Sequence, residues 1–332
     1  MAYTSIDDPA QYFNTVLYTG DGGSNRSVTV DFQPNFVWIK ERNGTNDNTL
    51  FDSVRGATKR LRSNAAEAED TQANQLKSFD SDGFTLGSLS AVNNNGQNYV
   101  SWNWKEDATA GFDIVSYTGN SSDGTTVQDI SHSLSAVPHW IIVKNKADST
   151  NWAVYHKGNT SAPETEIIYL NATNATSDDS AFFGDTAPTS SQFRVGGDNG
   201  VNGNGDGMIA YVWSEKKGFS KFGKYSANND ADGPFVYLGF RPAWLMLKVI
   251  DGNPGGWDLY DNKRGAFNGQ ISMLQANASS AQATSDAVDF LSNGFKIRNT
   301  SGNQNGSGDT IIYMAFAESP FVNSNGVPCN AR

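Results

Sequence analysis

One motif occurs three times at a fixed interval, and it limits the folds open to this chain. Residues 34–40, 138–144 and 242–248 each run from a proline through aromatic and aliphatic residues to a lysine. Their prolines are 104 residues apart both times, at positions 34, 138 and 242. This period is longer than that of solenoid repeats and equals the length of a small domain. The sequence therefore predicts three copies of one module.

Each copy carries the signals of several short strands. Proline is tolerated at the first residue of a strand, so it marks where the central strand of each copy begins. The run after it is apolar on both faces, which predicts a strand buried between two layers. We expect the closing lysine to emerge at the solvent edge. Other recurring segments are strands ending in Tyr18, Tyr117 and Tyr225, alternating strands at 82–87, 192–196 and 293–298, and aromatic strands at 99–104, 208–213 and 311–316.

These patterns predict an all-β chain of three tandem antiparallel β-sandwich modules of the jelly-roll, lectin-like type. The Ala- and Asn-rich stretches 63–73 and 276–287 are expected to hold at most one short helical turn. The short connections 105–110 and 214–218 predict touching modules, arranged either as a pseudo-threefold cluster or as a rod. The predicted parts are an N-terminal arm (1–12), module 1 (13–107), module 2 (108–216), module 3 (217–319) and an extended C-terminal tail (320–332).

Composition narrows the function classes. The formal net charge of −11 argues against nucleic acid as a partner, because binding to phosphates requires Lys and Arg. No stretch is apolar enough to predict membrane insertion. The single cysteine, Cys329, allows no disulfide within the chain. The first residues lack the basic and apolar regions of a secretory signal, so we expect synthesis in a cytoplasm without export by the usual route.

The strongest polar constellation is Asp-x-x-Arg-Gly. It occurs as Asp52, Arg55 and Gly56 in the first copy and as Asp261, Arg264 and Gly265 in the third. The middle copy, 152–158, keeps the aromatic strand but has neither the Asp nor the Arg-Gly. One interpretation is a ligand-facing ion pair. The interpretation we favour is a turn, in which Asp accepts backbone N–H groups, Arg pairs with it and Gly takes a positive φ.

Other polar groups give weaker signals. The loops 202–207 and 228–233 imitate the start of a calcium loop, but Trp213 and Gly239 stand where the bidentate Glu of an EF-hand belongs. The three histidines do not recur between copies, and the candidate carboxylate pairs occur once each. We therefore predict no enzyme, and no catalytic, cofactor-binding or metal-binding residues. The histidines are His132, His139 and His156, and the carboxylate pairs are Asp178 with Asp179 and Glu164 with Glu166.

The combination of Tyr-Thr-Gly, Pro-x-[Phe/Trp]-hydrophobic-Lys, Asp-x-x-Arg-Gly, Asp/Asn-Gly-Phe and Trp-x-Trp-Lys resembles an uncharacterised three-repeat family of virion proteins in marine tailed phages. The opening residues 12–20 and the closing residues 321–332 are similar to that family too. The resemblance implies a structural component of the particle with lectin-like modules, of the kind labelled tail-fibre or decoration proteins. It implies no catalytic residues, because none are established for the family.

These observations predict a non-enzymatic structural protein on the exterior of a tailed-phage virion, assembled in the host cytoplasm. The first candidate role is a tail-fibre or appendage adhesin that contacts host surface glycans. A capsid decoration or head-fibre protein is the alternative, and a glycan depolymerase is a second one. Expected partners are other virion proteins and host surface carbohydrate, with the chain present as a homo-oligomer (a trimer) or in many copies on the particle.

Overall fold

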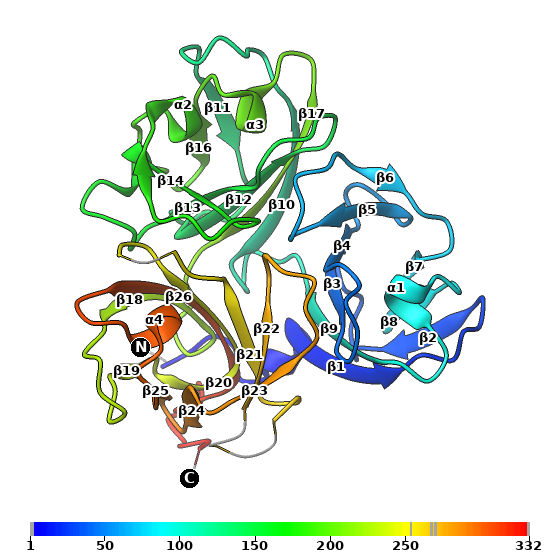
Figure 1. Cartoon of the computed structure of the whole chain (residues 1–332), viewed down its shortest axis with the longest axis vertical. Coiled ribbons are helices and arrows are strands. Elements are labelled where there is room, and N and C mark those ends of the chain that lie inside the picture. The colour runs from blue at the N-terminus through cyan, green and yellow to red at the C-terminus, as the bar shows by residue number, and fades with distance from the viewer. Residues whose placement is uncertain (1–2, 253, 266–267, 269–270, 331–332) are drawn as a thin grey trace.

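The computed structural model describes residues 3–252, 254–265, 268 and 271–330. The fold is all-β, and its strands form three similar lobes around a common centre, as Figure 1 shows. The described part contains no helix that is both long and apolar enough to cross a membrane. The first and last described segments meet at the lobe of the last strands, where the Ser324 N–H donates to Asp7 at 2.7 Å.

Module 1 consists of a six-stranded sheet and a three-stranded sheet. The first strand pairs with the last, and the second with the last but one, as in a jelly roll. The large sheet has the order β1 (Phe13–Thr19), β9 (Asn98–Trp104), β3 (Phe36–Glu41), β4 (Thr49–Asp52), β5 (Lys59–Arg62), β6 (Asp70–Thr71). The small sheet has the order β2 (Arg26–Thr29), β8 (Gly83–Leu86), β7 (Leu76–Asp80), and the helices are η1 (Pro9–Gln11) and α1 (Ser90–Asn93).

Module 2 repeats this order with one difference. Its small sheet has two strands among the described residues, and the short helix α2 supplies Phe182 and Phe183 to the core of the module. The large sheet has the order β10 (Phe112–Thr118), β17 (Gly207–Trp213), β12 (Trp140–Asn145), β13 (Ala153–His156), β14 (Glu166–Tyr169), β15 (Ser177–Asp178). The small sheet pairs β11 (Gln128–Ser131) with β16 (Gln192–Val195), and the helices are η2 (Pro163–Thr165), α2 (Ser180–Phe183) and α3 (Asn199–Asn202).

Module 3 again has a six-stranded and a three-stranded sheet. The large sheet has the order β18 (Ser220–Ser226), β26 (Thr310–Pro320), β20 (Phe240–Val249), β21 (Asp258–Asp261), β22 (Ile271–Gln275), β23 (Ala283–Ser285). The small sheet has the order β19 (Phe235–Tyr237), β25 (Gly294–Ile297), β24 (Val288–Leu291), and the helix is α4 (Gly302–Asn305).

The central strand of each large sheet is buried on both faces, as the apolar runs predict. In β3, Phe36 and Trp38 belong to a core shared by all three modules, whereas Val37 and Ile39 pack against the small sheet of module 1. This alternation follows from the two-residue period of a strand. A strand with a core on each side needs apolar residues at every position, which explains why the run does not alternate.

The shared core, called the central core from here on, contains all eight tryptophans of the chain. The closing strands of the modules meet in it through equivalent aromatic residues. The ring of Trp104 lies 6.5 Å from that of Trp213 and 5.8 Å from that of Phe316, measured between centroids. The three modules therefore share one hydrophobic interior.

Three equivalent backbone hydrogen bonds close the modules into a ring. The N–H of Glu69 in module 1 donates to the carbonyl of Lys146 in module 2, at 2.9 Å. Thr176 N–H of module 2 donates to Ile250 in module 3 at 2.9 Å, and Gln282 N–H of module 3 donates to Arg42 in module 1 at 2.7 Å. Each module thus contacts both others, so the arrangement is a pseudo-threefold cluster and not a rod. The three contact regions are called seams below.

Two local expectations differ from the structure. The stretches 63–73 and 276–287, expected to hold at most one short helical turn, contain the outermost strands β6 and β23. The short helices α1, α3 and α4 come just before the closing strand of each module. The outer strands form next to a seam, where the neighbouring module supplies the acceptors for Glu69 and Gln282.

The third copy also departs at its proline. Pro242 lies inside β20 instead of before it, and register shifts on either side of it mark a bulge against β26. A bulge is one of the places where a strand tolerates a proline. β26 reaches Pro320, beyond the expected end of module 3. The tail expected to be extended folds back after that point, with Val322 paired to Pro328 and Cys329 N–H donating to the Phe321 carbonyl.

Candidate functional site

The Asp-x-x-Arg-Gly element of module 1 lies at the seam with module 2. Asp52 accepts the backbone N–H of Arg55 at 2.8 Å and its Nε at 2.5 Å, and Gly56 has φ +89°. This is the turn that the sequence predicts. Asp52 also accepts the hydroxyl of Tyr211 from module 2, at 2.7 Å. Because both Asp52 and the Arg55 side chain are almost fully buried, the ion pair joins two modules and does not face solvent.

The Asp-x-x-Arg-Gly element of module 3 likewise forms a buried ion pair that contacts the neighbouring module, here at the seam with module 1. Asp261 pairs with Arg264 at 2.5 Å and accepts the indole N–H of Trp102 at 3.0 Å. The guanidinium of Arg264 lies 5.4 Å from the centroid of the Trp102 ring, within the range of a cation–π contact. Tyr211 and Trp102 occupy equivalent positions on the closing strands β17 and β9.

The seam between modules 2 and 3 has His156 in place of the aspartate. The equivalent closing-strand residue is Met314, which has no N–H or O–H to donate. The His156 Nδ1 accepts the N–H of Gly158 at 2.9 Å, so Nε2 carries the proton and donates to the Tyr313 carbonyl at 3.3 Å. Burial lowers the pKa of His156 to about 3, so this imidazole is neutral. The middle copy therefore replaces a charged acceptor by a neutral donor where its neighbour offers only a carbonyl.

A second set of equivalent side-chain donors crosses the same three seams. Trp152 Nε1 of module 2 donates to the Arg62 carbonyl of module 1 at 2.9 Å, and Trp257 Nε1 of module 3 donates to the Tyr169 carbonyl of module 2 at 2.9 Å. In module 1 the position is Asn48, whose Nδ2 donates to the Gln275 and Ala278 carbonyls of module 3 at 3.1 and 2.9 Å. At all three seams, a side chain at the same position of the repeat therefore donates to main-chain carbonyls of the neighbouring module.

The comparison with protein families agrees with this closed unit. A single family model, described as Domain of unknown function (DUF7483), matches residues 8–320. The chain belongs to this family. The match spans all three modules. No curated protein matches the chain.

The expectation that the lysine of the repeated motif is exposed to solvent is wrong for this DUF7483 chain. Lys40, Lys144 and Lys248 are fully buried and do not emerge at a solvent edge. Each ammonium donates to two main-chain carbonyls of the loops nearby, for example Lys144 to Asn145 at 2.7 Å and to Asp148 at 3.0 Å. Burial lowers the pKa of all three lysines to about 8. The lysines therefore brace loops from inside.

Each of the two calcium-like loops is held by an asparagine pair that joins it to another segment of its module. Asn202 accepts the N–H of Asn120 at 2.9 Å and donates to the Asn120 side chain at 3.0 Å. In the second loop, Asn228 makes the equivalent pair of contacts with Asn305, at 2.8 and 3.0 Å. Within the described ranges, no group of three or more His, Cys, Asp or Glu side chains is placed to hold a metal ion.

The other candidate residues lie in separate places. His132 is next to the Thr189 carbonyl, and His139 is 3.1 Å from the Lys157 ammonium. Asp179 caps α2 by accepting the Ala181 N–H at 3.0 Å, directly after Asp178 at the end of β15. Glu164 belongs to η2, whereas Glu166 begins β14.

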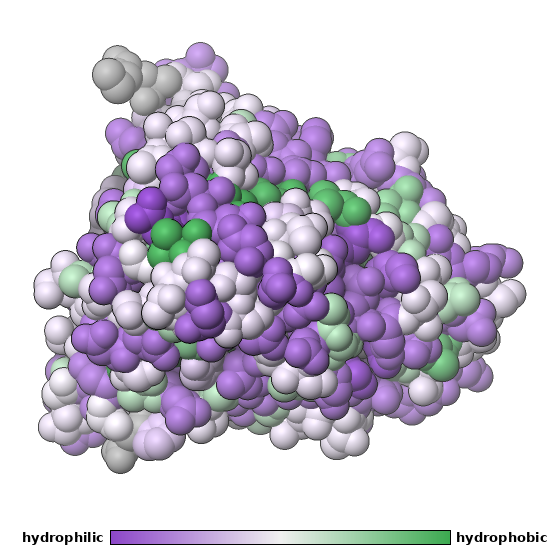
Figure 2. Space-filling model, turned by 90° about the horizontal axis from the view of Figure 1, so that it is seen from above, coloured by the Kyte–Doolittle hydropathy of each residue, from purple (hydrophilic) through white to green (hydrophobic). Residues whose placement is uncertain are grey.

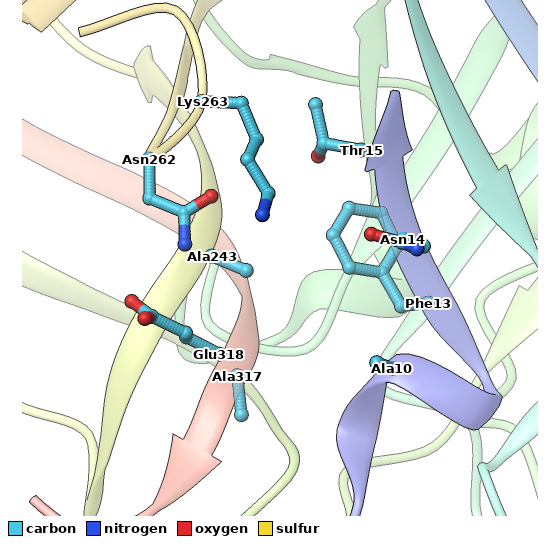
Figure 3. A pocket seen from close by; sticks show the side chains of 9 residues that line it. All are labelled: Ala10, Phe13, Asn14, Thr15, Ala243, Asn262, Lys263, Ala317 and Glu318. Atoms are coloured by element: carbon cyan, nitrogen blue, oxygen red, sulfur yellow. The ribbon is translucent and has the colours of Figure 1, made fainter. Parts of the chain in front are cut away.

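A small pocket opens at the seam between modules 3 and 1 (Figure 3). Thr15 and Asn262 line it, and their Oγ1 and Oδ1 atoms are buried without a hydrogen-bond partner among the described residues. The Lys263 side chain extends across it in Figure 3, and Glu318 is paired with Arg241 at 2.5 Å. Its volume of about 70 Å³ is room for about two waters. Pockets for organic ligands are typically about 300–1,000 Å³, so this one is too small for a sugar.

An open hollow in module 3 is larger, at about 330 Å³, and is lined by Asn268, Asp286, Asp289 and Arg298. The face shown in Figure 2 is mostly hydrophilic, with small separate hydrophobic areas. Phe235 and Tyr237 on β19 stand out in module 3, being 47% and 49% exposed. The sequence analysis did not single them out. Aligning the copies strand by strand would have found them, because the equivalent residues in modules 1 and 2 are polar.

Proposed function

We propose that this chain is a non-enzymatic structural protein on the exterior of a tailed-phage virion, and that it acts as a tail-fibre or appendage adhesin that contacts host surface glycans. The observation that carries the proposal is that the recurring polar residues make contacts within the protein. The Asp–Arg pairs, the lysines and the Trp152-type donors all bind main chain or a neighbouring module. The repeated chemistry therefore holds a rigid ring together, which suits display and attachment.

The shape of the ring supports attachment to a partner with threefold symmetry. Three modules around one axis offer three equivalent surfaces, and symmetric assemblies bind best to partners that share their symmetry. A trimeric fibre is one such partner, and a threefold position on a shell is another. Binding at a threefold position on a shell would correspond to the alternative role, a capsid decoration or head-fibre protein. The resemblance of the sequence motifs to virion proteins is compatible with both roles.

The test is to locate the chain on particles purified from a culture that produces it. We expect mass spectrometry to find the chain in the particle band, and cryo-electron microscopy to show three-lobed density on the outside. Density at the tail supports the adhesin, and density on the shell supports decoration. Absence of the chain from washed particles overturns the proposal. Release of reducing sugar from host polysaccharide by the purified chain would instead establish a depolymerase.

A further inference from the structure

The exposed aromatic pair occurs in only one module. Val28, Ile130 and Val236 are the equivalent buried residues of the edge strands β2, β11 and β19, and their neighbours on either side face outward. Those outward residues are Ser27 and Thr29 in module 1, Asp129 and Ser131 in module 2, and Phe235 and Tyr237 in module 3. An aromatic pair on a face that is polar in its two sister copies has no role in the shared fold.

The two rings are held in place by their surroundings. A Cβ built on Gly294 of the neighbouring strand would lie 3.2 Å from Phe235 Cε2, so this ring reaches across the glycine. The Tyr237 hydroxyl lies 3.3 Å from that of Tyr3, and the Lys221 ammonium lies 5.5 Å from the centroid of the Tyr237 ring. Rings fixed in this way lose little conformational entropy when a ligand covers their exposed faces.

Most charged groups beside the rings form ion pairs with one another, whereas Lys221 donates to the Tyr237 carbonyl at 2.7 Å. Lys296, directly opposite Phe235 on β25, binds Asp232 at 2.8 Å. Arg298 binds Asp289 at 3.2 Å, and both residues line an open hollow together with Asp286 and Asn268. This rim offers hydrogen-bond donors and acceptors in similar numbers, without an excess of one charge. It matches a neutral ligand with many hydroxyl groups.

We propose that the outer face of β19 and β25 in module 3 binds a neutral, hexose-based polysaccharide by stacking sugar rings on Phe235 and Tyr237. The inference rests on the proposed function, and it names the site and the class of glycan. The C–H face of a pyranose is apolar and matches the negative face of an aromatic ring. Sugar hydroxyls around that face can then bond to the paired charges of the rim.

A protein partner fits this face less well. Stable protein interfaces bury about 1,200–2,000 Å² in total, which requires a broad apolar centre. In the part of the chain that the structure describes, the other exposed large hydrophobic residues lie on modules 1 and 2 and in the tail, and none belongs to a strand of module 3. They are Leu17, Val54, Val127, Val137 and Val327.

The test is native electrophoresis of the full chain in gels that each contain one soluble polysaccharide: a galactomannan, an α-glucan, a β-glucan or a polyuronate. We expect at least one neutral polysaccharide to retard the wild-type chain. The double variant Phe235→Ser with Tyr237→Thr copies the residues of module 1, and we expect it to raise the dissociation constant at least fivefold. Phe235→Leu keeps the apolar character but removes the ring face, and we expect it to weaken binding as well.

The matched control is Ser27→Ala with Thr29→Ala at the equivalent positions of module 1, which should leave retardation unchanged. The site is wrong if no neutral polysaccharide retards the chain or if the double variant is retarded equally. It is also wrong if only the polyuronate binds, or if the wild type self-associates and the double variant does not. Particle location is measured separately, so a chain found on virions without glycan binding would overturn the site and leave its virion role standing.

Discussion

At the scale of single residues, each seam pairs an acceptor with the donor that the neighbouring module offers. Asp52 faces the Tyr211 hydroxyl and Asp261 faces the Trp102 indole. A buried carboxylate opposite Met314 would lack such a donor, and an unpaired buried charge costs several kcal/mol. His156 avoids this cost because its neutral ring satisfies both nitrogens. The contacts at this seam therefore explain why module 2 lacks Asp-x-x-Arg-Gly, and no loss of a ligand site is needed.

We expect His156 to make the free energy of unfolding depend on pH. Its pKa falls from 6.5 in the unfolded chain to about 3 in the folded one, mainly through burial. Between these values the unfolded state binds more protons, so the folded state loses stability as the pH falls from 6.5 towards 3. The loss contributed by His156 should be on the order of 3 kcal/mol by pH 4. We expect His156→Gln, which keeps a donor for Tyr313, to flatten this part of the stability curve.

The measurement is urea unfolding followed by tryptophan fluorescence at several pH values between 4 and 7. His132→Gln is the comparison variant, because burial also lowers the pKa of the half-buried His132 and this variant keeps His156. An equally steep loss of stability in His156→Gln and wild type would show that another group controls the acid response.

At the scale of elements, the last residue but one of each central strand is a buried lysine that donates to main-chain carbonyls, mostly at and beyond the end of the strand. Lys144 at the end of β12 donates to the Asn145 and Asp148 carbonyls. We expect Lys144→Met to lower the free energy of unfolding by about 1–3 kcal/mol, because these carbonyls lose a charged donor inside the protein.

Lys77→Met is the matched control. Lys77 also donates to a carbonyl, that of Ser24 at 3.0 Å, but it does so at the surface. Exposed substitutions usually change stability by less than about 0.5 kcal/mol. Equal effects of the two variants in denaturant unfolding would contradict the role assigned to the buried lysines.

The sequence was sufficient to predict the positions of those strands that carry an apolar pattern within their own residues. The strands after Pro34 and Pro138 and the closing aromatic strands lie where the repeats predict them. The lysine ends were mispredicted because the carbonyls that bind them come from loops with no apolar signal. The outer strands β6 and β23 were missed because their polar residues pair next to another module. Tyr211 and Asp52 lie 159 residues apart, and no pattern within one copy predicts that contact.

At the scale of the whole molecule, the modules depend on one another. The centre-facing residues of module 2 include Trp140, Trp152 and Trp213, all buried in the central core. Residues 108–216 expressed alone would expose this aromatic face to water. We expect such a fragment to bind a hydrophobic dye and to unfold without a cooperative transition, whereas the full chain unfolds cooperatively under the same conditions.

Calorimetry and dye fluorescence on the fragment and the full chain provide the comparison. A sharp calorimetric transition in the fragment, without dye binding, would mean that a module folds alone and that the central core is an interface between finished domains.

The covalent linkage of the three modules has a consequence for how such a molecule can change. In an assembly of three identical chains, every substitution appears three times around the axis, so a change that suits one position is imposed on the other two. Here each copy is encoded separately. A histidine can replace one of the three equivalent acid positions, and one strand can gain Phe235 and Tyr237 while its sisters stay polar. New recognition can therefore arise on one third of the ring while the other two thirds keep it folded.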